Sequence, residues 1–180
     1  PSVMASTHTL LDQINVMCYD MDYLPQTWHN AALIEGGDPT KPVAQSRIAA
    51  FINVGVPKSK LGLGIPFYGR RWTGTTQLSS NGNKIGEIRY GSLVSDASLW
   101  QDVYKKWDAT HLAEYLSVTA SNQFISFNGD RAIHEAVAYG KAQGFGGFMT
   151  FSLSKEYIPS ASGDARSPLS TTLSFEVNGH

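Results

Sequence analysis

The stretch Ile14-Asn15-Val16-Met17-Cys18-Tyr19-Asp20 is an apolar run that ends in a phenol and a carboxylate. Two later stretches are built in the same way, LGLGIPFYGR at residues 61–70 and GFGGFMTFSLS at residues 144–154. Apolar runs with little alternation are typical of parallel strands that are buried on both faces. We expect strands at residues 11–20, 61–67 and 146–153, with polar and aromatic side chains at their carboxyl ends.

The segments between and after these strands have helical spacing. Residues 42–54 predict an amphipathic helix that Pro57 follows. Asp130 is placed to cap a second helix, which ends at Gly144, and a last helix begins at about Pro168. The apolar face of the second helix consists of Ile133, Ala136, Val137 and Gly140. The order strand, helix, strand favours a parallel pair with a right-handed crossover.

Residues 72–128 differ in character, because they are rich in Ser, Thr, Asn and Tyr. Short strands are expected at residues 86–90 and 123–127, and a helix at residues 98–107. We interpret this segment as a small α+β insertion. The predicted division is therefore residues 1–71, the insertion at residues 72–128, and residues 129–180.

Composition excludes several classes of function. The chain has 180 residues, a net charge of −1 and no basic stripe, so it does not resemble a nucleic-acid-binding protein. No apolar run approaches the roughly 20 residues that span a bilayer. The single cysteine, Cys18, is expected to be a buried, unreactive thiol. The five histidines lack metal-ligand spacing and no nucleotide fingerprint occurs, so we expect neither a metal nor another cofactor.

The predicted sheet is incomplete. Three free-standing parallel strands expose unpaired edges, which soluble proteins avoid. An eight-stranded α/β barrel needs about 250 residues, whereas roughly 120 remain here once the insertion is removed, enough for about three strand–helix units. The chain begins at Pro1 without an initiator Met. We therefore expect it to be part of a longer product.

Taken in order, the three stretches resemble strands 6 to 8 of the barrel of glycoside hydrolase family 18, the chitinase family. The resemblance rests on three motifs: Met-x-Tyr-Asp at residues 17–20, Gly-x-Pro-Phe-Tyr-Gly-Arg at residues 64–70 and Gly-Gly-Phe-Met at residues 146–149. The loop His29-Asn30-Ala31-Ala32-Leu33 and parts of residues 88–133 are also similar to the family's loop and insertion domain. The resemblance covers residues 11–173. It implies an α/β fold, the C-terminal portion of a TIM barrel that carries the chitinase insertion domain.

The family's substrate-assisted mechanism implies roles for residues of this chain. Tyr19 would hold the acetamide of the −1 sugar, and Asp20 would accept a hydrogen bond from the sugar or near the catalytic acid. Tyr68 and Arg70 would line the cleft. Met17 would pack under the sugar or in the core, and Phe151 would form the floor where a Trp is common. Trp28 would contact the aglycon side or be an ordinary loop aromatic.

The chain also departs from the family pattern. The family's fourth strand usually ends in Asp-x-x-Asp-x-Asp-x-Glu, where the Glu is the general acid, and no such run is present here. Loss of the general acid costs roughly 10²–10⁴ in rate. We therefore expect the chain alone not to hydrolyse chitin. Tyr23 stands where many members have Gly, so the loop after Asp20 is expected to take another path.

Three hypotheses remain open at this point. The first is the C-terminal part of a secreted chitinase that acts on chitin or chitooligosaccharides, with the N-terminal part of the same barrel as its partner. The second is a catalytically inactive chitinase-like lectin, whose parent would lack the Glu. The third is an assembly unit that covers its sheet edges by self-association, which a size-exclusion measurement would detect.

Overall fold

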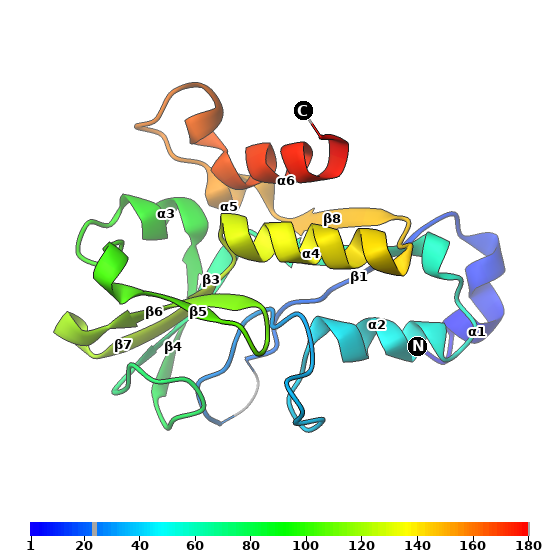
Figure 1. Cartoon of the computed structure of the whole chain (residues 1–180), viewed down its shortest axis with the longest axis horizontal. Coiled ribbons are helices and arrows are strands. Elements are labelled where there is room, and N and C mark those ends of the chain that lie inside the picture. The colour runs from blue at the N-terminus through cyan, green and yellow to red at the C-terminus, as the bar shows by residue number, and fades with distance from the viewer. Residues whose placement is uncertain (23–24, 180) are drawn as a thin grey trace.

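The computed structural model describes residues 1–22 and 25–179, and it contains two sheets with helices around them (Figure 1). Tyr23 lies outside the described residues, so the expected change of loop path after Asp20 stays a prediction. The strands are β1 Ile14–Val16, β2 Leu61–Pro66, β3 Tyr68–Thr73, β4 Asn83–Arg89, β5 Lys105–Asp108, β6 Ala113–Val118, β7 Gln123–Phe127 and β8 Gly147–Phe151. The α-helices are α1 Met4–Thr7, α2 Ala44–Ile52, α3 Tyr90–Ser95, α4 Asp130–Gln143, α5 Leu153–Glu156 and α6 Pro168–Asn178.

The first sheet is parallel and has the order β1-β2-β8. Leu63 in the central strand pairs with Val16 on one side and with Phe148 on the other. All six residues of β2 are buried, which agrees with its apolar sequence. Gly64 lets β1 approach, because a Cβ there would lie 2.5 Å from the Val16 carbonyl oxygen. The expected parallel sheet of three strands is therefore confirmed, although β1 is shorter than residues 11–20.

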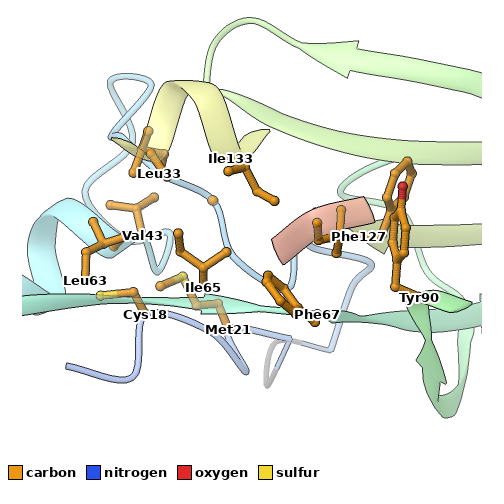
Figure 2. Packing of buried hydrophobic residues seen from close by; sticks show 14 of the residues in the cluster. Cys18, Met21, Leu33, Val43, Leu63, Ile65, Phe67, Tyr90, Phe127 and Ile133 are labelled. Carbon is orange, nitrogen blue, oxygen red and sulfur yellow. The ribbon is translucent and has the colours of Figure 1, made fainter. Parts of the chain in front are cut away.

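The core lies on β2 and the helices that cover it. Figure 2 shows Leu63 and Ile65 pointing toward Leu33, Val43 and Ile133. The predicted face of α4 is confirmed, since Ile133, Ala136, Val137 and Gly140 are all buried. Cys18 belongs to the same cluster, and burial raises the pKa of its thiol to about 12, so the thiol stays protonated at neutral pH.

Helix α4 begins and ends near the predicted residues, but its cap differs. Gly144 has φ +74 at the C-terminus, a left-handed conformation that glycine adopts without strain. The predicted capping by Asp130 is wrong. Glu114 of β6 accepts hydrogen bonds from the backbone N–H of Gly129 at 2.8 Å and of Ala132 at 3.0 Å. Asp130 instead accepts a hydrogen bond from Thr172 of α6.

The second sheet is antiparallel, with the order β4-β3-β7-β6-β5, and it lies at the end of the molecule opposite α1 (Figure 1). Only Phe67 separates β2 from β3, so the predicted boundary between residues 71 and 72 falls inside β3. The edge-to-face pair of Trp72 and Phe124, both fully buried, packs within this sheet. The three-part division of the chain otherwise stays a prediction.

The predicted helix at residues 98–107 is wrong. The Asp96 carboxylate binds the N–H and hydroxyl of Ser98, which forms a turn where the helix was expected to begin. Lys105–Asp108 then forms β5, in which Trp107 pairs with Glu114 of β6. Strand pairing with β6 therefore outweighs the local helical preference of this segment.

Both outer strands of the parallel sheet are open. Among residues 1–22 and 25–179, β1 and β8 each pair with β2 alone. A groove of about 600 Å³ lies beside β8, lined by Phe145, Phe148, Leu173 and Val177 of β8, α6 and the loop after α4. The geometry thus leaves room for further strands on either side. No helix in the described ranges is long and apolar enough to cross a membrane.

Candidate functional site

Three aromatic rings gather where the parallel strands end. The rings of Tyr19 and Phe151 are stacked, with centroids 5.8 Å apart and an interplanar angle of 24°. The ring of Tyr68 meets both of them edge-on, at 6.1 and 6.3 Å. Residues from three separate sequence stretches therefore form one aromatic cluster at the carboxyl ends of the strands, as predicted.

The Asp20 carboxylate lies beside this cluster. Its Oδ1 accepts hydrogen bonds from the Tyr68 hydroxyl, at 2.5 Å, and from Arg70. Partial burial acts to raise the pKa of Asp20, but these hydrogen bonds and the Arg70 charge outweigh burial, and the pKa is lowered. Asp20 is therefore ionised at neutral pH. Burial and the hydrogen bond to Asp20 raise the pKa of Tyr68, which keeps this phenol a donor.

Further charged groups surround Arg70, which belongs to β3 of the antiparallel sheet. The Nε of Arg70 lies 3.4 Å from the buried carboxylate of Asp22, and Lys84 of β4 lies 2.6 Å from the same Oδ2 atom. Burial acts to lower the pKa of Arg70, yet the hydrogen bond to Asp20 and the negative charges nearby raise it overall. Four side chains of alternating charge thus extend from β4 of the antiparallel sheet to the site: Lys84, Asp22, Arg70 and Asp20.

The Tyr19 hydroxyl has a weak hydrogen-bond partner, although the residue as a whole is only 4% exposed. Within the described part of the chain, its hydrogen-bond contact is the Met149 sulfur at 3.9 Å, and a thioether is a weak acceptor. Burial, followed by the charge of Asp20, raises the pKa of Tyr19, so the hydroxyl is protonated at neutral pH. The group therefore keeps its proton and can act as a hydrogen-bond donor.

Asn30 holds the backbone around the site, a role that the sequence did not indicate. Its side-chain oxygen accepts the Asp20 N–H at 3.1 Å, and its amide nitrogen donates to the Tyr68 carbonyl at 3.2 Å. Its own N–H donates to the hydroxyl of Ser126 at 2.8 Å. Asn30 is fully buried, so it connects three elements inside the protein.

Lys155 is a second site residue that sequence reasoning missed. Its ammonium lies 4.1 Å from the Tyr68 ring centroid and 4.8 Å from that of Phe151. Glu87 of β4 holds it with both carboxylate oxygens, each at 2.8 Å. Its position four residues after Phe151 in the sequence could have indicated that it lies near the aromatic cluster. Its partner Glu87, however, comes from the antiparallel sheet.

Two predicted contacts turn out differently. Trp28 is buried, and its indole N–H donates to the Pro42 carbonyl at 3.0 Å. The predicted sugar contact of Trp28 is therefore wrong for this chain, and the alternative of an ordinary loop aromatic holds. Met17 is 62% exposed, which excludes core packing in the chain as described and leaves its sugar contact untested.

The fold also brings together His29, Asp108 and His111, which are distant in sequence. The Asp108 Oδ2 accepts hydrogen bonds from His29 Nε2 at 2.9 Å and from His111 Nδ1 at 2.8 Å. A metal on His29 Nε2 would require a proton on its Nδ1, and that atom is buried without a partner among the described residues. Metal-bound histidines normally donate this second N–H. We therefore interpret the cluster as a hydrogen-bonded support for the loop that carries Asn30.

This cluster predicts a pH-dependent stability. Burial lowers the pKa of His29 despite its bond to Asp108, so the unfolded chain takes up the proton at a higher pH than the folded chain. Stability is then full above the unfolded pKa of about 6.5 and declines as the pH falls below it. Denaturant unfolding at pH 7.5, 6.5 and 5.5 should show a falling free energy. His29→Gln should flatten this slope, whereas the exposed His134→Gln should preserve it. A His29→Gln variant with an unchanged slope would contradict the assignment.

Comparisons with known proteins agree with this architecture. The family model for glycosyl hydrolases family 18 matches residues 3–156. Chitinase A1 of Niallia circulans is 31% identical over 175 residues, which cover 84% of this chain and 25% of that protein. The structure of chitinase ChiW from Paenibacillus sp. str. FPU-7 matches with a TM-score of 0.83 and 26% identity, over 97% of this chain and 20% of that chain. The chitinase-like agglutinin of Robinia pseudoacacia matches with a TM-score of 0.76 and 27% identity, over 96% of this chain and 49% of that chain.

The chain thus spans a quarter of the length of chitinase A1 and half or less of the two matched structures. The parallel sheet and the five-stranded antiparallel sheet together correspond to part of the chitinase fold. Because the family model covers residues 3–156, we conclude that this chain belongs to glycoside hydrolase family 18.

Proposed function

We propose that this chain supplies half of the −1 subsite of a chitinase, with β1, β2 and β8 as strands 6, 7 and 8 of a TIM barrel. The supporting observation is that five side chains lie together where the parallel strands end: Tyr19, Asp20, Tyr68, Arg70 and Phe151. Upstream strands of the parent protein would complete the barrel and bring the general acid. The open edges of β1 and β8 are consistent with this arrangement.

In this proposal the substrate is a polymer of β-1,4-linked N-acetylglucosamine. The acetamide oxygen of the −1 sugar attacks the anomeric carbon of the same sugar while the glycosidic C–O bond breaks, and the general acid from the upstream strands protonates the leaving oxygen. Water then adds to the anomeric carbon of the oxazolinium-like intermediate and opens it, with overall retention of configuration. A well-oriented internal nucleophile has an effective concentration of about 10⁵–10⁸ M, so the protein's main task is to hold the acetamide in line. Tyr19, whose hydroxyl contacts the weak acceptor Met149 at 3.9 Å, would donate to the acetamide oxygen in this proposal. The ionised Asp20 stabilises the positive charge that develops on the oxazolinium-like intermediate.

The aromatic cluster would bind the apolar face of the sugar. Phe151 is 47% exposed, so part of its ring is available to a ligand. Arg70 is held by Asp20 and Asp22 and would line the cleft rather than take part in proton transfer. The chain alone contains no segment that could serve as the family's acid-bearing motif. We therefore propose that hydrolysis needs the upstream strands.

A direct test compares the 180-residue chain with a chimera in which it replaces the matching segment of Niallia circulans chitinase A1. The chain alone should release no sugar from chitotetraose. The folded chimera should hydrolyse it, and NMR should show a product with retained anomeric configuration. Circular dichroism and thermal melting establish that the chimera is folded. Hydrolysis by the chain alone, or a folded chimera that binds chitotetraose without cleaving it, would contradict the proposal.

A second candidate function is carbohydrate binding without hydrolysis. The observation in its favour is the similarity to the chitinase-like agglutinin of Robinia pseudoacacia. The two functions differ in the residue that ends the fourth-strand motif of the parent protein. A Glu at that position favours the enzyme, and any other residue favours the lectin. ChiW is described as a cell-surface-expressed enzyme, and we propose an extracellular location for the parent of this chain as well.

A further inference from the structure

The backbone that carries the proposed catalytic groups leaves its sheet early. Strand β1 ends at Val16, so Met17 to Asp20 lie beyond the paired register with β2. Asp20 has φ +57, a left-handed conformation that is uncommon for a residue other than glycine. Such a conformation persists only where the surroundings hold it in place. The direction of the Tyr19 ring and of the Asp20 carboxylate therefore depends on whatever binds this segment.

Arg47 of α2 binds the carbonyl side of the segment. Its Nη1 donates to the Met17 carbonyl at 2.8 Å and to the Tyr19 carbonyl at 2.7 Å. Its Nη2 lies 3.4 Å from the Asp20 carbonyl. One planar guanidinium with five N–H donors can serve three carbonyls, which a lysine ammonium cannot match in geometry. Because Asn30 accepts the Asp20 N–H, the segment is held from both sides.

The position of Arg47 on α2 indicates that it binds the backbone of residues 17–20 and does not mainly pack the helix. Neighbouring Ala44 and Ile48 supply the buried face of α2, while Arg47 is only partly buried. Its guanidinium donates to backbone carbonyls of the candidate site. Loss of the guanidinium should consequently leave the helix packed and release the segment that carries Tyr19 and Asp20.

We propose that Arg47 is a positioning residue for the −1 subsite, which fixes the Tyr19 hydroxyl and the Asp20 carboxylate through their backbone. The statement about the subsite rests on the proposed function, whereas the statement about the backbone does not. Arg47 itself touches no substrate in this proposal. It acts through the conformation of residues 17–20.

The test uses the 180-residue chain and its Arg47→Met variant, which keeps an apolar stem of similar length. We expect the unfolding midpoint to stay near that of the wild type. Amide hydrogen exchange at Asp20, followed by NMR, should become about tenfold faster, because the segment opens locally. In the chimera, which has the complete subsite, the affinity for chitotetraose should fall about tenfold, since the groups are no longer pre-organised. In the hydrolysing chimera, kcat should fall by up to about 10²-fold, with a smaller change in KM.

Arg131→Met is the matched control, because Arg131 lies over Trp107 in another part of the molecule. It should change none of these readouts. Arg47→Lys should give values between those of the wild type and Arg47→Met. If Arg47→Met does not fold, Arg47→Lys is used as the test variant. Unchanged Asp20 exchange in a folded Arg47 variant would overturn the positioning role. If the folded chimera fails to bind chitotetraose while Asp20 exchange in the 180-residue chain still responds to Arg47, the proposed function fails and the backbone role stands.

Discussion

Replacing Asp20 by Asn is expected to lower kcat/KM of the hydrolysing chimera for chitotetraose by about 10²–10³-fold, the usual effect of removing one preorganised electrostatic partner. Asn keeps the shape of the side chain and removes its charge. Two partners, Tyr68 and Arg70, then lose the carboxylate that they share. In the proposed mechanism the cationic intermediate also loses the stabilising charge of Asp20. The loss should appear mainly in kcat, because the charge matters most when the intermediate forms.

The measurement is steady-state hydrolysis at neutral pH, with thermal melting to confirm folding. Asp102→Asn is the matched control, because Asp102 is exposed and its ion-pair partner among the described residues is Lys105, at the start of β5. It should leave kcat/KM unchanged. The lowered pKa of Asp20 means that the carboxylate is ionised at the neutral pH of this measurement, so Asp20→Asn removes a full negative charge. An Asp20→Asn variant within threefold of the wild type would exclude a catalytic role for this carboxylate.

Replacing Asn30 by Leu is expected to destabilise the chain by about 2–6 kcal/mol. The side chain is fully buried and bonds the Asp20 N–H and the Tyr68 carbonyl. Leu would leave both backbone groups unpaired, and each buried unpaired group costs about 1–3 kcal/mol. Domains are stable by only about 5–15 kcal/mol, so the variant should be close to unfolding.

Urea unfolding of the wild type, Asn30→Leu and two further variants tests this expectation. Ser126→Ala removes only the acceptor of the Asn30 N–H, so it should cost about 1–3 kcal/mol. Asn178→Leu, at an exposed position in the last helix, should cost far less. A loss below about 1 kcal/mol for Asn30→Leu would mean that water or another group satisfies these backbone atoms.

Much of the site could be predicted because parallel strands place their ends at one edge of the sheet. The polar residues that follow each apolar run, Tyr19 with Asp20, Tyr68 with Arg70, and Phe151, are adjacent for this reason. What could not be predicted is the second set of contacts. Lys155 needs Glu87 from the antiparallel sheet, and Arg70 needs Asp22 and Lys84. These partners are separated along the chain by tens of residues, and no local pattern relates them.

Local reasoning also failed where two strands compete with a helix. We expected a helix at residues 98–107, but Lys105–Asp108 pairs with β6. The cap of α4 likewise comes from Glu114 and not from the adjacent Asp130. Trp28 carries no mark in the sequence that separates a buried indole from an exposed one. In each case a partner distant along the chain decides the outcome.

The amino-acid sequence by itself determined the family, the three parallel strands, the helices between them and the set of side chains at the strand ends. The strands and helices follow from short-range periodicity, whereas the family follows from the order of motifs along residues 11–173. Only the tertiary structure decided which groups contact each other, which of them are ionised, and that Arg47 and Asn30 hold the segment at Asp20. The physical reason is that hydrogen bonds and burial depend on distances in space, and folding sets those distances between residues far apart in the chain.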